Sequence, residues 1–170
     1  RSAGLDFSFV DLNDMAALEA AVQPNTKMIW CETPTNPLLK IVDIARLADI
    51  AHTHGIPLIV DNTVATPCLL RPFEYGADIV VHSLTKWFGG HGTGIGGVVV
   101  DSGRFNWAAG KHSLFTTPDN SYHGLRWGMD LPEPLRPLAY ILRMRTVPLR
   151  NLGACIAPDN SWFFLQGIET

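Results

Sequence analysis

Two short apolar runs in the sequence each end in side chains that can do chemistry. The first run, residues 57–60, leads directly into Asp61, which places a carboxylate where a buried strand would end. The next run is followed by Ser83, Thr85 and Lys86, so two hydroxyls and an amine occupy a similar position. Because ligands of open α/β sheets bind at the carboxyl ends of the strands, these groups are candidates for one site.

An acid, a lysine and flanking hydroxyls are the groups that a pyridoxal phosphate (PLP) site needs. An amine such as that of Lys86 forms a Schiff base with the cofactor aldehyde, and an apolar setting after a buried strand would lower its pKa. A carboxylate such as Asp61 can pair with the pyridine nitrogen, which makes the ring an electron sink. The hydroxyls of Ser83 and Thr85 can bond the phosphate.

Each of these residues also has an ordinary structural interpretation. An Asp after a strand commonly caps a turn, and a Lys at a strand end is usually solvated. Isolated serines and threonines in loops are equally common. Taken together, with a glycine-rich stretch directly behind Lys86, they favour the functional interpretation.

The glycine-rich stretch is not interpreted as a dinucleotide site. Residues 92–97 (GTGIGG) fit the G-x-G-x-x-G spacing, but that motif must follow a strand and open a helix. Here it leads into the strand-like run 98–100, so flexible backbone near a cofactor or a tight turn explains the glycines better. A nucleotide hydrolase with a metal-binding Asp61 is disfavoured, because the sequence contains no G-x-x-x-x-G-K-[ST] loop.

The elements that must position these residues alternate between helices and strands. Asp43 is predicted to cap a helix that Gly55 closes, and a shorter helix is expected after residues 10–14. Further helices are predicted at 143–152, despite Pro148, and from residue 162. Strands are predicted at residues 27–31, 57–60, 78–82 and 97–100. Short, fully apolar strands alternating with helices indicate an α/β fold with a parallel sheet covered on both faces.

Composition limits the classes of function. The chain has 170 residues, 46% apolar and 17% charged, with a net charge of −3, which is typical of one α/β domain. It has no basic run for nucleic acid, no apolar stretch long enough to span a membrane, and no signal-peptide layout at residues 1–4.

Cysteines and histidines indicate neither a disulfide framework nor a metal site. Cys31, Cys68 and Cys155 are far apart and form no CxxC pair, so we expect buried free thiols in a reducing compartment. His52 and His54 lie on different faces of one predicted helix, and the other histidines are isolated.

Three motifs make the comparison with a known family specific. Residues 32–37 (ETPTNP), 60–63 (VDNT) and 83–86 (SLTK) resemble, in order and spacing, the Cys/Met-metabolism PLP enzymes. This family includes cystathionine γ-synthase, cystathionine lyases, methionine γ-lyase and O-acetylhomoserine sulfhydrylase. The segments 119–124 and 165–170 are most similar to the sulfhydrylases.

The resemblance implies a role for each candidate residue. Lys86 would carry the cofactor and move protons, and Asp61 would pair with the pyridine nitrogen. Ser83 and Thr85 would lie at the phosphate, and Asn36 would reach the ring hydroxyl. The implied fold is three-layer α/β/α with a mostly parallel sheet, the aspartate-aminotransferase-like large domain of fold type I, here truncated. Residues 1–150 would be part of that PLP-binding domain, and 151–170 would begin the connection to a C-terminal domain.

The resemblance also implies a reaction and a setting. The reaction would be γ-replacement on O-acetylhomoserine with sulfide, which gives homocysteine, in a cytoplasmic homo-oligomer that is a tetramer in intact members. Alternatives are a cystathionine γ-synthase or methionine γ-lyase activity, or a catalytically silent remnant that serves as an assembly module. Since intact members are longer and place further site residues outside the matched segment, we expect these 170 residues alone to be inactive.

Overall fold

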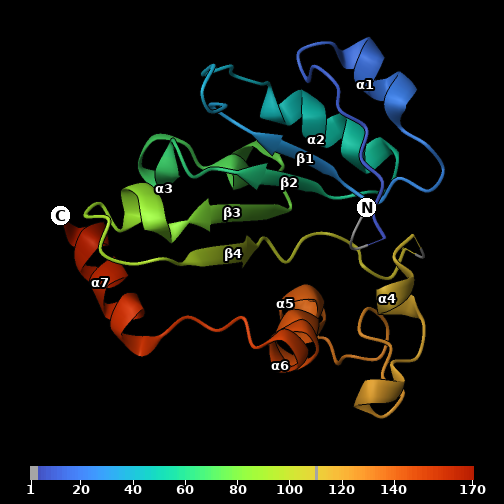
Figure 1. Ribbon diagram of the computed structural model, residues 1–170. Coiled ribbons are helices and arrows are strands. Elements are labelled where there is room, and N and C mark those ends of the chain that lie inside the picture. Colours follow the sequence, from blue (N-terminus) through green and yellow to red (C-terminus); the bar gives the residue numbers. More distant parts are fainter. Residues whose placement is uncertain (1–3, 110) are drawn as a thin grey trace.

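The computed structural model describes residues 4–109 and 111–170, and its centre is a four-stranded sheet (Figure 1). The strands are β1 (Ile29–Glu32), β2 (Leu58–Asp61), β3 (Ile79–Ser83) and β4 (Gly97–Asp101), in that spatial order. The first three run parallel and β4 runs antiparallel to β3. The predicted mostly parallel sheet is therefore confirmed. The expectation that the start of the chain has no signal-peptide layout falls partly on residues 1–3, which lie outside the described residues.

The helices are mostly short. They are α1 (Met15–Ala21), α2 (Ile44–Thr53), α3 (Thr66–Leu69), α4 (Ser113–Thr116), α5 (Ala139–Thr146), α6 (Pro148–Leu152) and α7 (Pro158–Glu169). Tighter or wider helical turns are η1 (Pro72–Tyr75), η2 (Leu84–Phe88), η3 (Asn120–Tyr122) and η4 (Arg136–Leu138). Of these elements, η2 and α7 matter most for the candidate site.

One face of the sheet is covered by α2, as the apolar spacing predicts (Figure 1). Asp43 caps the helix, since its side chain accepts a hydrogen bond from the backbone N–H of Arg46 at 3.2 Å. Leu47 and Ala51 are fully buried in the same cluster as Leu58 of β2. The helix then ends before Gly55, whose φ of 65° is the left-handed conformation that glycine tolerates best.

The other face of the sheet is covered by the irregular segment that follows β4. Ile59 and Ile79 point to this side and pack with Trp107, Phe115 and Trp127. Because neighbouring residues of a strand face opposite sides, the fully apolar strands can supply both cores. The sheet is thus enclosed on both faces, and the predicted three-layer α/β/α arrangement is confirmed.

Two predicted helices differ in their bounds. The expected helix at 143–152 is two helices, because α5 begins earlier and the chain breaks at Val147 before α6. The pyrrolidine ring of Pro148 disfavours helical continuation through the preceding residue and suits the first turn of a new helix. For the same reason α7 begins at Pro158, four residues before the expected start at Trp162.

The cysteine prediction is only partly right. Cys31 is buried, but Cys68 and Cys155 are exposed, and all three are free. Cys68 lies on the short helix α3 and Cys155 in the link between α6 and α7, and neither belongs to the two buried clusters of the described residues. In the part of the chain that the structure describes, no helix is long and apolar enough to cross a bilayer.

Replacing Asp43 with alanine tests the capping of α2. We expect Asp43→Ala to lower the free energy of unfolding by about 1 kcal/mol, because the first turn loses an acceptor for a backbone N–H. Urea denaturation followed by circular dichroism measures the change. Asp49→Ala is the control, since Asp49 is an exposed carboxylate on the same helix away from its first turn. Equal losses in both variants would contradict the capping role.

Candidate active site

β2 and β3 run parallel (Figure 1). The candidate acid at the end of β2 and the first hydroxyl at the end of β3 therefore lie at the same edge of the sheet, where the strands finish. Asp61 is the last residue of β2 and lies opposite Val81 of β3. Ser83, two residues further along, ends β3. Alternation along the strands places Asp61 and Ser83 on the same face, which is also the face of Ile59.

Lys86 lies just beyond this edge, in the short turn η2. Its backbone, at φ −92° and ψ −124°, departs from helical values inside that turn. The side chain is exposed, so the expectation of an apolar setting for this lysine is wrong in this chain. The apolar run before Lys86 is β3, which is buried between the layers on the two faces of the sheet. η2 follows β3 and lies outside those layers.

The amine of Lys86 differs from those of the other lysines in its contacts. Lys27 and Lys111 donate to backbone carbonyls, at 2.6 and 2.7 Å. Lys40 is paired with Asp11 at 3.2 Å. Within residues 4–109 and 111–170, Lys86 is the one lysine whose amine has neither a hydrogen bond nor an ion pair. It is therefore free to react with a carbonyl group.

The two candidate hydroxyls have different partners. The Thr85 hydroxyl donates to the carbonyl of Gly96 at 3.2 Å and accepts from the Gly96 N–H at 3.1 Å. Its single proton is thereby used to close the turn that leads into β4, which leaves none to donate to a phosphate. The Ser83 hydroxyl has no bond to any described residue, so it remains available to a ligand.

Asn36 lies on the loop that follows β1. It is exposed, and β1 is separated from β3 by β2. The loop contains two cis peptide bonds, before Pro34 and before Pro37. Among the described residues no hydrogen bond joins Asn36 to Asp61, Ser83 or Lys86. The structure therefore brings Asn36 to the same edge of the sheet without connecting it to the other candidates.

Residues that sequence reasoning did not single out tie the ends of β2 and β3 together. Thr63 accepts a hydrogen bond from the backbone N–H of Ser83 at 2.8 Å. Its own N–H donates to the Asp61 carboxylate at 3.0 Å. The His82 ring is hydrogen-bonded to the carbonyl of Asn62 at 3.1 Å. Asn62 and Thr63 belong to the VDNT motif, but only strand pairing shows what they bond.

Burial keeps two groups beside this network uncharged near neutral pH. Desolvation lowers the pKa of His82, although the Asn62 carbonyl and the charge of Asp61 oppose the shift. Burial raises the pKa of the Cys31 thiol to about 12, and Asp61 adds to this shift. Cys31 is therefore an inert thiol, because the thiolate is the nucleophilic form.

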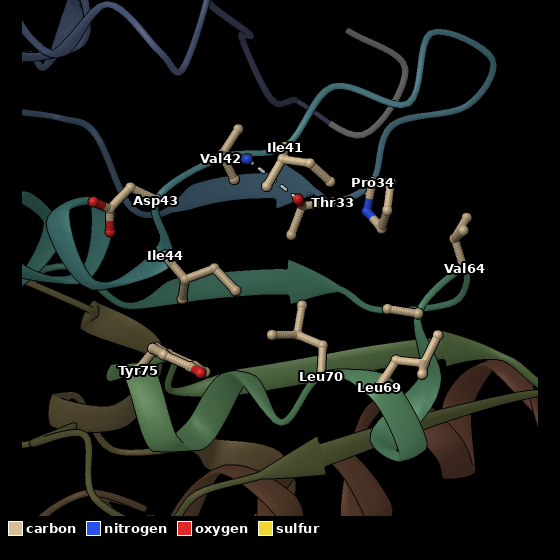
Figure 2. Close-up of a pocket in the computed structure, with 11 residues that line it drawn as sticks. Thr33, Pro34, Ile41, Val42, Asp43, Ile44, Val64, Leu69, Leu70 and Tyr75 are labelled. Carbon is tan, nitrogen blue, oxygen red and sulfur yellow. Dashed lines mark hydrogen bonds between the residues drawn. The ribbon is translucent and has the colours of Figure 1, made fainter.

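A hollow in the described surface lies away from these residues. Its volume is about 490 Å³ and its lining is largely apolar, with Ile41, Ile44, Val64, Leu70 and Tyr75 among the lining residues (Figure 2). It is on the α2 side of the sheet, and none of the candidate site residues lines it. Among the described residues, no group of three His, Cys, Asp or Glu side chains is arranged to hold a metal ion.

Thr63→Val tests the link between the strand ends. Valine has the same shape but cannot accept the Ser83 N–H, so we expect the free energy of unfolding to fall by about 1–2 kcal/mol. Chemical denaturation gives the value. Thr93→Val serves as the control, because Thr93 is exposed and makes no hydrogen bond to a described residue. A loss in Thr63→Val no larger than in the control would show that the link is unimportant.

The lowered pKa of His82 predicts that acid destabilises the chain. In the unfolded chain histidine takes up a proton below about pH 6.5, its ordinary pKa, while buried His82 stays neutral. The unfolded state then binds more protons, so the free energy of unfolding should fall as pH drops from 6.5 through the folded-state pKa.

Unfolding titrations between about pH 5 and 8 measure this dependence. The slope should be reduced in His82→Gln. It should be reduced further when His112, whose pKa burial also lowers, is replaced as well. An unchanged slope in both variants would contradict the buried neutral state of these histidines.

Several known proteins are similar to this chain in sequence or in structure. An O-acetyl-L-homoserine sulfhydrylase of Leptospira meyeri is 46% identical over 98% of this chain and 39% of its own length. A Campylobacter jejuni crystal structure described as an O-acetylhomoserine (thiol)-lyase matches with a TM-score of 0.84. It is 42% identical over 94% of this chain and 39% of its own, and it carries N′-pyridoxyl-lysine-5′-monophosphate.

A cystathionine γ-lyase from Lactobacillus plantarum, solved with L-serine, matches with a TM-score of 0.70. It is 35% identical over 98% of this chain and 35% of its own. The chain thus spans less than two-fifths of the proteins it matches. The model of the Cys/Met metabolism PLP-dependent enzymes matches residues 1–170. With a match over its whole length and relatives more than 40% identical, the chain belongs to the family of Cys/Met-metabolism PLP-dependent enzymes.

Proposed function

We propose that the whole protein catalyses a PLP-dependent γ-replacement, in which sulfide displaces acetate from O-acetylhomoserine and homocysteine is formed. The observation that carries the proposal is the free amine of Lys86 at the sheet edge where Asp61 and Ser83 end their strands. The name of the Leptospira relative supports the choice of substrate. Since the chain spans 39% of that relative, the activity concerns the whole protein.

The residues present fit the cofactor. When bound, PLP supplies an electron sink for charge that develops on the substrate. Lys86 would hold the cofactor, and its amine would then move a proton at the substrate α-carbon. The carboxylate of Asp61, steadied by the Thr63 N–H, would accept a hydrogen bond from the pyridine nitrogen. The lysine modification in the Campylobacter structure supports a lysine as the attachment point.

The hydroxyls and Asn36 would divide the remaining contacts. Ser83, whose hydroxyl is free, would donate to the phosphate. The resemblance places Thr85 there too, but its hydroxyl donates to the Gly96 carbonyl and would have to exchange that bond to reach the phosphate, so we assign it the shaping of the turn. Asn36 would reach the ring hydroxyl from the loop after β1, as the family resemblance implies.

The organisation and setting of the whole protein follow the same resemblance. Residues 1–150 would be part of the PLP-binding domain and 151–170 would begin the connection to a further domain. Exposed large apolar side chains, such as Leu69, Trp87 and Ile95, support a homo-oligomer, a tetramer in the family. Three free cysteines are compatible with a reducing, cytoplasmic compartment.

The likeness to a cystathionine γ-lyase supports a second candidate activity within the family, that of a cystathionine γ-synthase or a methionine γ-lyase. A sulfhydrylase consumes sulfide and forms homocysteine from O-acetylhomoserine, whereas a cystathionine γ-synthase requires cysteine as the thiol. A γ-lyase needs no second thiol and releases a 2-oxo acid and ammonia. Product analysis of the whole protein with each thiol separates these activities. A catalytically silent assembly module would give none of these products and would retain no PLP on Lys86.

Cofactor attachment can be tested in the chain itself. We expect added PLP to give a yellow absorption band that borohydride removes, with the label on Lys86 after peptide mapping. Lys86→Ala should lose the band, because the other lysines are engaged in hydrogen bonds or an ion pair. Lys40→Ala is the matched control and should keep it. A label spread over Lys27, Lys40 and Lys111 would contradict the proposed site.

A further inference from the structure

The last helix of the chain packs against the segment that contains Lys86. We call residues 89–96, which connect η2 to β4, the glycine loop. Phe164 of α7 is buried, with 3% of its surface exposed, while its neighbours Phe163 and Leu165 are 37% and 63% exposed. The exposures show that one side of the helix is directed into this part of the molecule, and α7 contacts η2.

The ring of Phe164 packs against three glycines of this segment, Gly89, Gly94 and Gly96. A Cβ atom at Gly96 would lie only 2.5 Å from the ring, and one at Gly89 only 3.0 Å. At Gly94 the corresponding distance is 3.4 Å. Since real Cβ atoms do not approach as closely as 2.5 Å, the ring fills space that exists because Gly96 has no side chain. The glycine loop therefore acts as a packing surface as well as a turn.

Two further contacts fix the helix at either side of Phe164. The side-chain amide of Asn160 donates to the carbonyl of Ile95 at 3.1 Å. A Cβ atom at Gly167 would collide with the carbonyls of Phe88 and Gly89, so the helix backbone lies directly against the end of η2. The C-terminal part of α7 therefore abuts the segment that carries Lys86.

Few hydrogen bonds within η2 stabilise its conformation. It is five residues long, with a break in helical geometry at Lys86, and it is closed by the Gly89 N–H to Leu84 carbonyl bond at 2.9 Å. Thr85 anchors it to Gly96 on the β4 side. A turn of this kind gains its stability from what packs on it.

We propose that Phe164 is a positioning residue for Lys86: α7 packs on the glycine loop and holds η2, so that Lys86 stays at the end of the sheet where β2 and β3 finish. This inference rests on the proposed function only in taking Lys86 as the cofactor lysine. It assigns residues 158–169 a role in the site, beyond the start of a connection to another domain.

Phe164→Ala tests the inference, with Phe163→Ala as a matched control on the same helix. We expect hydrogen exchange of the amides in residues 84–97 to rise by about tenfold in Phe164→Ala and to stay unchanged in the control. The apparent affinity of Lys86 for PLP should fall on the order of tenfold, and the pH at which the bound cofactor changes colour should shift. Phe164→Leu should restore most of both properties.

A second variant guards against simple unfolding of Phe164→Ala. Gly96→Ala introduces the methyl group that would meet the ring, so it should displace α7 and raise exchange in η2. In Gly96→Ala/Phe164→Ala the ring is absent, so the two effects should be less than additive. Additive effects, or exchange in Phe164→Ala equal to that in Phe163→Ala, would overturn the inference.

The outcomes also separate the inference from the proposed function. If the unchanged chain takes up no PLP on Lys86, the cofactor proposal fails for this chain. The exchange measurements and the pair of Gly96 and Phe164 variants then still decide whether α7 holds η2. If PLP labels Lys86 equally well and with the same pH profile in Phe164→Ala and Phe163→Ala, the cofactor proposal stands and the positioning role is wrong.

Discussion

The candidate site depends on the parallel pairing of β2 with β3. That pairing places Asp61 opposite Val81 and brings the end of each strand to one edge of the sheet. A shift of one residue would turn Asp61 or Ser83 to the opposite face, because side chains alternate along a strand. The hydrogen bond from the Ser83 N–H to the Thr63 hydroxyl continues the connection two residues beyond the last pair, Asp61 and Val81. The position of η2, and with it Lys86, follows from this edge.

Hydrogen bonding then separates residues of the same type into different roles. Ser83 and Thr85 are two hydroxyls two positions apart, yet one is free and the other closes the turn to Gly96. The lysines divide in the same way, because a donor that already serves a carbonyl or carboxylate must lose that bond before it can react. Lys86 differs because it lies on a turn outside both cores, where its amine has no acceptor among the described residues.

The glycine loop contacts both the turn that carries Lys86 and the helix α7. On one side Gly96 bonds the hydroxyl of Thr85, and on the other it leaves space for the ring of Phe164. A backbone position without a side chain, such as Gly96, can be approached closely from both directions, which explains why a glycine lies there. The turn is thus enclosed between the sheet edge and α7, although the amine it carries is exposed in this chain.

The sequence by itself determined the parts that depend on near neighbours along the chain. The Asp43 cap, the end of α2 before Gly55 and the apolar strands of a sheet covered on both faces were predicted, because capping and periodicity act over a few residues. The resemblance of three motifs to a known family implied the mostly parallel three-layer α/β/α arrangement. Tertiary structure alone decided the exposure of Lys86, the hydrogen bond that the Thr85 hydroxyl donates to Gly96, the link from Thr63 to Ser83 and the packing of Phe164. These features join residues from 11 to 75 positions apart, as in Thr85 with Gly96 and Gly89 with Phe164. Only the packing of the layers sets which of those residues meet.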